Sequence, residues 1–191
     1  LNIHPLMLAR CLDLAVVPGV ISYGPAILLE YPAALDGEAE GPAYLTFVLQ
    51  SPVLVTIRHG RMPVLNDLIQ DLVAEKAPSL SHLVQVLYLI LDDLTDLSVQ
   101  AETEARDQIL RLARTLSEDP GAVHASDLTK LRWQVDKLVS LVENQLYCIA
   151  GLNASDNEAL QEPHRKAYIQ DLMSEVEIAQ RGIYRLEARV N

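Results

Sequence analysis

Seven apolar residues near the C-terminal end of the chain recur alternately three and four positions apart, and they constrain the fold more than any other feature. They are Ile169, Leu172, Val176, Ala179, Ile183, Leu186 and Val190. This spacing places them in one stripe along an α-helix, the kind of stripe with which helices pack in a coiled coil. No C-cap glycine or proline follows Val190, so we expect this helix to continue beyond Asn191.

A much longer helix is predicted upstream. Apolar residues keep a helical spacing over residues 80–116, Ser79 or Ser81 can serve as the N-cap, and Glu118-Asp119-Pro120-Gly121 stops the helix. At roughly 1.5 Å per residue such a helix is about 60 Å long. Because one compact domain of this size needs no helix of that length, we expect it to project or to pack against partners.

A second helix is predicted to begin near Ser126 and to run to Ile149. Its apolar residues also recur alternately three and four positions apart, and we call such a stripe a seam. Gly151-Leu152-Asn153 is expected to end this helix, and a polar loop to Pro163 then leads into the C-terminal helix. These three helices make residues 80–190 predominantly helical.

The first part of the chain is different, because its short apolar runs lie between turn residues. His4-Pro5 predicts a short helix with proline at its first position. Residues 26–31, 44–49 and 53–57 predict strands, the last two as a hairpin, and residues 64–77 predict an amphipathic helix. Residues 1–3 read as the end of a strand, so we expect the sheet to lack its first strands.

The predicted fold class is therefore α+β: an N-terminal α/β sandwich-type sheet domain, then long antiparallel helices and a coiled-coil stalk helix. The domain boundaries expected from these patterns are residues 1–77 for the sheet domain, 78–152 for the helical hairpin, and 153–191 for the loop and stalk helix.

Composition excludes several function classes. With 26 Asp and Glu against 15 Lys and Arg, the net charge of -11 disfavours nucleic acid as a partner. The only two cysteines, Cys11 and Cys148, lie in unlike segments and have no Cys-x-x-Cys spacing, so they suggest neither a disulfide framework nor a thiolate zinc site. The sequence contains no apolar run of membrane-spanning length and no signal peptide, so the chain is expected to be soluble as it stands.

No enzyme motif is present: there is no glycine-rich phosphate loop, no Gly-x-Ser-x-Gly and no His-Glu-x-x-His, so we expect no enzymatic activity. Two acidic groups stand out instead. Asp92, Asp93 and Asp96 belong to the first long helix, and Asp171, Glu175 and Glu177 belong to the last. Each group is either a solvated face or, through its carboxylate oxygens, a site for Mg²⁺ or Ca²⁺.

Four short stretches, in this order along the chain, resemble the cytosolic domain of the CorA family of divalent metal-ion transporters, which includes ZntB. They are Ile3-His4-Pro5-Leu6, Val53-Leu54-Val55-Thr56-Ile57-Arg58-His59, Leu87-Tyr88-x-x-x-Asp92-x-Leu94-x-Asp96 and Tyr168-Ile169-x-Asp171-Leu172. The resemblance spans nearly the whole chain.

The resemblance implies a homopentamer at the cytoplasmic face of the inner membrane, with the stalk helix continuing into a C-terminal membrane segment that this chain lacks. It implies no tightly bound cofactor, and divalent cations (Mg²⁺, Co²⁺ or Zn²⁺) as ligands. The residue at the position of Asp171 binds a regulatory cation in the magnesium members, and Glu175 lies four residues on. The family's acidic partner positions are Ala9 and Arg10 here, so we expect Arg10 to pair with Asp171 between subunits.

The predicted function is the cytosolic regulatory and assembly domain of a CorA-like transporter of magnesium, cobalt or zinc. The alternative is a soluble coiled-coil scaffold or adaptor, which binds partner helices through its apolar seams and moves no ions.

Overall fold

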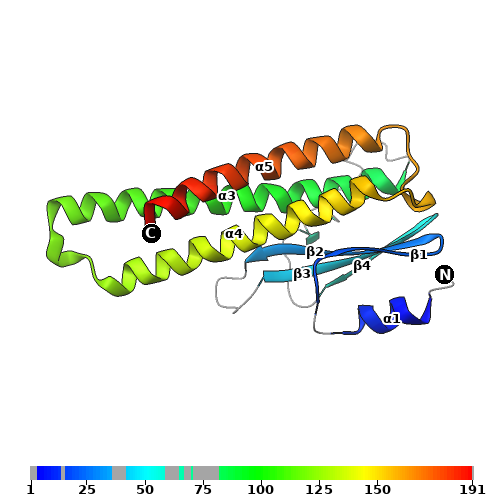
Figure 1. The fold of residues 1–191 in the computed structure, drawn as a ribbon, viewed down its shortest axis with the longest axis horizontal. Helices are drawn as coiled ribbons and strands as arrows, with labels where there is room; N and C mark the ends of the chain where they lie inside the picture. Colours follow the sequence, from blue (N-terminus) through cyan, green and yellow to red (C-terminus); the bar gives the residue numbers. More distant parts are fainter. Residues whose placement is uncertain are drawn as a thin grey trace.

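The computed structural model describes residues 4–13, 16–35, 42–58, 65, 66, 70 and 82–190. Its elements are α1 (Pro5–Cys11), β1 (Gly19–Tyr23), β2 (Ala26–Leu35), β3 (Pro42–Gln50), β4 (Val53–Arg58), α3 (Leu83–Glu118), α4 (Ala125–Ala154) and α5 (Arg165–Val190), with 3-10 turns at Pro120–Ala122 and Glu158–Leu160. The predicted α+β class is confirmed: an antiparallel sheet is followed by long helices (Figure 1).

The four strands form a meander in the order β1-β2-β3-β4, and each pairs antiparallel with the next. The predicted hairpin of β3 and β4 is confirmed. Strand β1 was not predicted, although Pro18 precedes it and the turn at Gly24-Pro25 follows it. The predicted helix over residues 64–77 lies largely outside the described residues.

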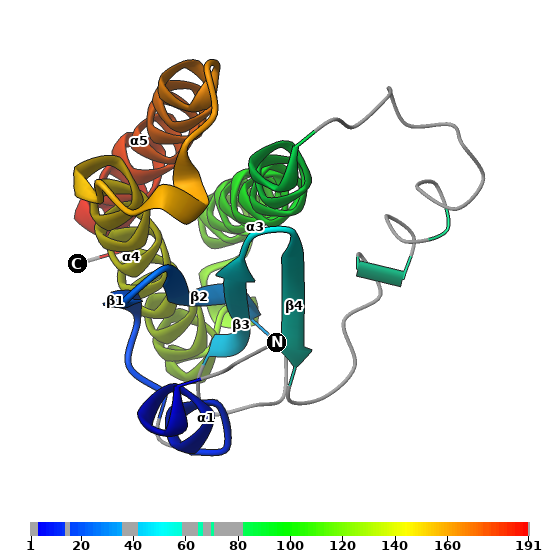
Figure 2. The ribbon, with the colours of Figure 1, turned by 90° about the vertical axis from the view of Figure 1, so that its right-hand side faces the viewer.

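Both faces of the sheet are covered, which explains why β2 reads as a nearly continuous apolar run. One face packs on the long helices through residues such as Leu29, Tyr31 and Phe47. On the other face, Leu28 and Val48 contact Met7 and Cys11 of α1. Figure 2 shows α1 on one side of the sheet and the helices on the other.

Helices α3, α4 and α5 form a bundle along one side of the sheet (Figure 1). At ~1.5 Å per residue the 36 residues of α3 span about 54 Å, and the turn between α3 and α4 projects beyond both the sheet and α5. The stop predicted at Glu118–Gly121 is confirmed. The N-cap of α3 is His82, while the predicted caps Ser79 and Ser81 lie outside the described residues.

The predicted seam of α5 is buried: six of its seven residues are in the core, and Val190 packs against them. The seam of α4 is buried from Leu131 to Ile149, whereas Leu128 is exposed. Because α5 packs on α3 and α4 of the same chain, these seams form an intramolecular bundle. The two seams are therefore already occupied, and nothing in the described part of the chain favours a scaffold that binds partner helices through them.

One predicted helix end was wrong. We expected Gly151-Leu152-Asn153 to end the second helix, but α4 continues through Gly151 to Ala154. A Cβ at Gly151 would lie 3.1 Å from Cγ2 of Val20. Glycine therefore serves close packing of α4 on β1 here, which local sequence patterns do not distinguish from a helix stop.

Candidate functional site

Three carboxylates from two helices meet on the side of the bundle where α3 and α5 run together. Asp92 comes from α3, and Asp171 and Glu175 come from α5. One carboxylate oxygen from each lies within 4.8 Å of the others. Asp171 is exposed, and the other two side chains are half-buried. We call these three residues the acidic cluster.

Helix geometry explains the arrangement. Asp171 and Glu175 are four residues apart, so they lie one above the other on the same face of α5. The buried neighbours Leu172 and Val176 hold that helix against α3, and Leu91 and Leu94 hold the Asp92 turn of α3 in the core. The apolar seam therefore fixes the distance between the two acidic faces.

Two tyrosines support the acidic cluster. The hydroxyl of Tyr88 donates a hydrogen bond of 2.7 Å to Oδ2 of Asp171. The ring of Tyr88 stacks on that of Tyr168, with 4.8 Å between the centroids, and Gln85 donates from Nε2 to the Tyr168 hydroxyl at 3.3 Å. Two stretches that resemble the transporter family, around Tyr88 and around Tyr168, thus come together in one place.

The surroundings of the acidic cluster disfavour a negative charge on all three carboxylates at once. Burial raises the pKa of Glu175 to about 7, and the negative charges of Asp92, Asp171 and Asp96 add to the effect. Burial and the charge of Asp96 also raise the pKa of Asp92. Oε2 of Glu175 is buried and accepts no hydrogen bond from the described residues. The site consequently favours a proton or a cation on Glu175 over a third free charge.

The raised pKa of Glu175 predicts a pH dependence of stability. The glutamate is ionised in the unfolded chain above pH ~4.5 but keeps its proton in the folded chain up to about 7. A raised folded-state pKa gives stability that is present at low pH and is lost as the pH rises through about 7. Because Glu175 is only partly buried, solvent screening reduces this loss to about 1–2 kcal/mol.

Urea denaturation at pH 5 and pH 8 checks this prediction. Other carboxylates also titrate over this range, so the quantity to compare is the difference between the wild type and Glu175→Gln. The variant is expected to lose less stability on going to the higher pH, by the same ~1–2 kcal/mol. Parallel pH profiles for the two proteins would contradict the assignment.

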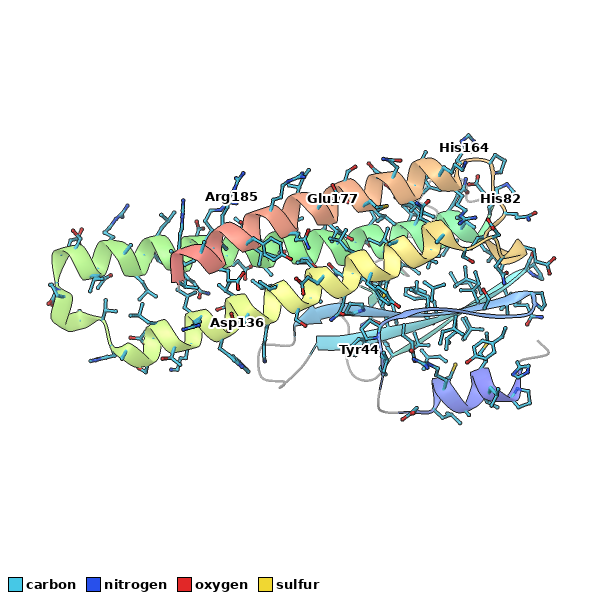
Figure 3. The ribbon with its side chains drawn as sticks, viewed as in Figure 1. Tyr44, His82, Asp136, His164, Glu177 and Arg185 are labelled. Carbon is cyan, nitrogen blue, oxygen red and sulfur yellow. The ribbon has the colours of Figure 1, made fainter. Side chains whose placement is uncertain are left out.

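Asp171 and Glu175, the predicted metal residues, lie together, and Asp92 of the other predicted acidic group joins them. Asp96 acts on the acidic cluster only through its charge, and Asp93 is not part of it. Glu177 lies on the outer side of α5 (Figure 3), 3.8 Å from Arg181. One residue of the first acidic group and two residues of the second therefore form one site.

Arg10 has a partner within its own chain. Its Nη2 and Nε donate to Oε2 of Glu30 on β2 at 2.6 and 2.9 Å. The predicted pairing of Arg10 with Asp171 is a contact between copies, which a single chain does not test. Glu30 was not among the predicted site residues, although a lone charged residue inside the apolar run of β2 indicates a buried partner.

The fold is similar to solved structures at low sequence identity. The complete CorA magnesium transporter from Methanocaldococcus jannaschii matches with a TM-score of 0.83 and 16% identity, covering 98% of this chain and 60% of that one. The soluble domain of CorA from the same organism matches with a TM-score of 0.79 and 16% identity, covering 96% and 74%. The ZntB cytoplasmic domain from Vibrio parahaemolyticus RIMD 2210633 matches with a TM-score of 0.72 and 13% identity, covering 99% and 78%.

The chain thus spans 60% of the length of the complete transporter chain that it matches. No helix in the described part of the chain combines the length and the hydropathy needed to cross a bilayer. A search of curated protein sequences gave no match. The family model described as "CorA-like Mg2+ transporter protein" matches residues 1–191, and the chain belongs to that family.

Proposed function

We propose that this chain is the cytosolic regulatory and assembly part of a CorA-like transporter of divalent cations, at the cytoplasmic face of the inner membrane. The observation that carries the regulatory role is the acidic cluster, in which three carboxylates share a space of 4.8 Å without a counter-charge among the ion pairs of the described residues. Family membership supports transport as the activity of the whole protein.

The donor set supports Mg²⁺ as the regulatory ion rather than Zn²⁺. The acidic cluster offers only carboxylate oxygens, with the Tyr88 hydroxyl beside them. Hard oxygen donors suit Mg²⁺, whereas protein zinc sites usually contain histidine or cysteine. Asp171 and Glu175 are then ligands from α5, and Asp92 is the ligand from α3.

A cation in the acidic cluster links two helices of one chain. It cancels the repulsion between the carboxylates of α3 and α5, and it replaces the proton that Glu175 otherwise retains. Binding therefore favours the arrangement in which α5 lies close to α3, and the free energy of binding is available to shift α5 between positions. This coupling acts within the subunit, before any contact between copies.

Calorimetric titration with MgCl2 at pH 8 tests the site. We expect one Mg²⁺ per chain, and about tenfold or more weaker binding in Asp171→Asn and Glu175→Gln, because each removes a charged ligand. Glu177→Gln is the matched control, since it removes an acidic residue of the same helix that lies outside the acidic cluster. Equal weakening by all three variants would show diffuse screening instead of a site.

Assembly into a homo-oligomer, a pentamer in the full-length protein, is the second part of the proposal. Asp171 is exposed, so its carboxylate is accessible to a neighbouring copy as well as to Tyr88. Sedimentation velocity on the same Mg²⁺ titration checks this part, because cation-linked assembly raises the mass of the wild type but not of Asp171→Asn. A wild-type mass that stays monomeric at saturating Mg²⁺ would restrict the cation to the role within one chain.

A further inference from the structure

Basic and acidic side chains are distributed unevenly along the helical bundle. Residues 106–137 and 180–190, at the end away from the sheet, contain nine Lys and Arg against six Asp and Glu. Residues 82–105 and 138–179, beside the sheet, contain two Lys and Arg against twelve Asp and Glu. A chain with a net charge of -11 therefore has one basic end, which we call the basic half.

A depression of about 450 Å³ lies in the basic half, between α3 and α4. It is lined by Gln108, Arg111, Leu112, Thr115, Asp127, Lys130, Leu131 and Gln134. Glu102 lies on the side of α3 that faces Gly182 of α5. Arg111 follows nine residues later, two and a half turns along the helix, so its side chain lies on the opposite side of α3. The depression therefore opens on the side of α3 that faces away from α5.

The lining suits a phosphate-bearing group. Arg111 and Lys130 bring one positive charge from each helix, and the hydroxyl of Thr115 and the amides of Gln108 and Gln134 add hydrogen-bond donors. Asp127 is the one acidic residue of the lining. Its carboxylate accepts a hydrogen bond of 3.2 Å from the backbone N–H of His124, at the N-terminal turn of α4, which offsets part of its charge.

Exposed apolar side chains accompany the basic residues. Trp133, the only tryptophan, is 53% exposed, and Nζ of Lys137 lies 3.3 Å from its ring centroid. Leu116 is 47% exposed and lies on α3 one turn after Leu112 of the lining. A basic surface with an exposed indole and leucine is typical of segments that bind the interface of anionic membranes.

We propose that the basic half of the bundle docks on an anionic phospholipid surface, with the depression between α3 and α4 holding a headgroup phosphate. Charge complementarity selects this surface, and the exposed indole favours a lipid interface over the acidic half of a second copy. The proposal goes beyond the cation site, because it concerns other residues and another ligand, and either can fail without the other.

Trp133 provides a direct readout, since the emission of an indole shifts to the blue when it enters a lipid interface. We expect a blue shift with vesicles of phosphatidylcholine and phosphatidylglycerol, no shift with phosphatidylcholine alone, and loss of the shift at high salt. Lys130→Gln is expected to weaken vesicle binding about fivefold, and Arg111→Gln with Lys130→Gln about thirtyfold.

Lys166→Gln is the matched control, because it removes an exposed lysine from the acidic end of the bundle. Weakening by Lys166→Gln equal to that by Lys130→Gln would overturn the site, as would a blue shift with phosphatidylcholine alone or no shift with either vesicle. Saturation of the depression by inorganic phosphate without vesicles would assign it to a soluble anion. A dimer without vesicles that Lys130→Gln dissociates would assign it to a second copy, and both results would overturn the lipid proposal.

Discussion

Arg10→Ala is expected to lower the free energy of unfolding by about 3 kcal/mol, the lower end of the range for breaking a buried ion pair, because Glu30 is buried while the Arg10 side chain is 33% exposed. The side chain of Glu30 is 3% exposed, and Arg10 holds its carboxylate with two hydrogen bonds. Removing the guanidinium leaves the carboxylate of Glu30 between α1 and the sheet without its ion-pair partner. Urea denaturation followed by circular dichroism measures the loss.

Two controls separate the ion pair from the rest of α1. Leu6→Ala on the same helix is expected to have little effect, because Leu6 is 64% exposed. The double variant Arg10→Met with Glu30→Leu is expected to recover most of the stability, since it replaces the pair with apolar groups of similar size. If the double variant is no more stable than Arg10→Ala, the loss comes from packing of α1 and not from the stranded carboxylate.

Gly182→Val is expected to destabilise the protein by about 2 kcal/mol, through overpacking where α5 crosses α3. A Cβ at Gly182 would lie 2.6 Å from Oε1 and 2.9 Å from Cδ of Glu102. Glu102 is 5% exposed, and its Oε1 accepts from Nη2 of Arg106 at 2.6 Å. The added side chain must therefore displace a buried, paired carboxylate or move α5 away from α3.

A double-mutant cycle isolates this clash. In a Glu102→Ala background the space beside Gly182 opens, so Gly182→Val is expected to cost well under half of its value in the wild type. The change in helix propensity from glycine to valine is the same in both backgrounds, so it cancels in the difference between the two free energies. Additive effects of the two substitutions would show that the close approach of α5 to α3 does not depend on this contact.

The local patterns of the sequence were informative wherever short-range rules govern the chain. The spacing along α5 predicted its buried face, Asp119-Pro120-Gly121 predicted the end of α3, and the turn after Gln50 predicted the hairpin of β3 and β4. Capping, proline geometry and amphipathic spacing act between residues a few positions apart. Such features can be predicted from one sequence.

The candidate site was predicted only in its parts. Asp171 and Glu175 are one helical turn apart, so their shared face follows from the sequence. That Asp92 joins them depends on the packing of α5 on α3, across 79 positions of sequence. The same holds for Arg10 and Glu30, which helical or strand periodicity cannot connect.

The sequence by itself determined the α+β class, the end of α3 and most of the apolar face that each long helix buries, because these depend on neighbours along the chain. Only the tertiary structure decided that the seam of α5 packs on its own chain, that Gly151 continues a helix, and that three carboxylates crowd into one cluster. Those outcomes depend on which distant surfaces fit together, and burial then changes the energy of every charge that the fit brings close.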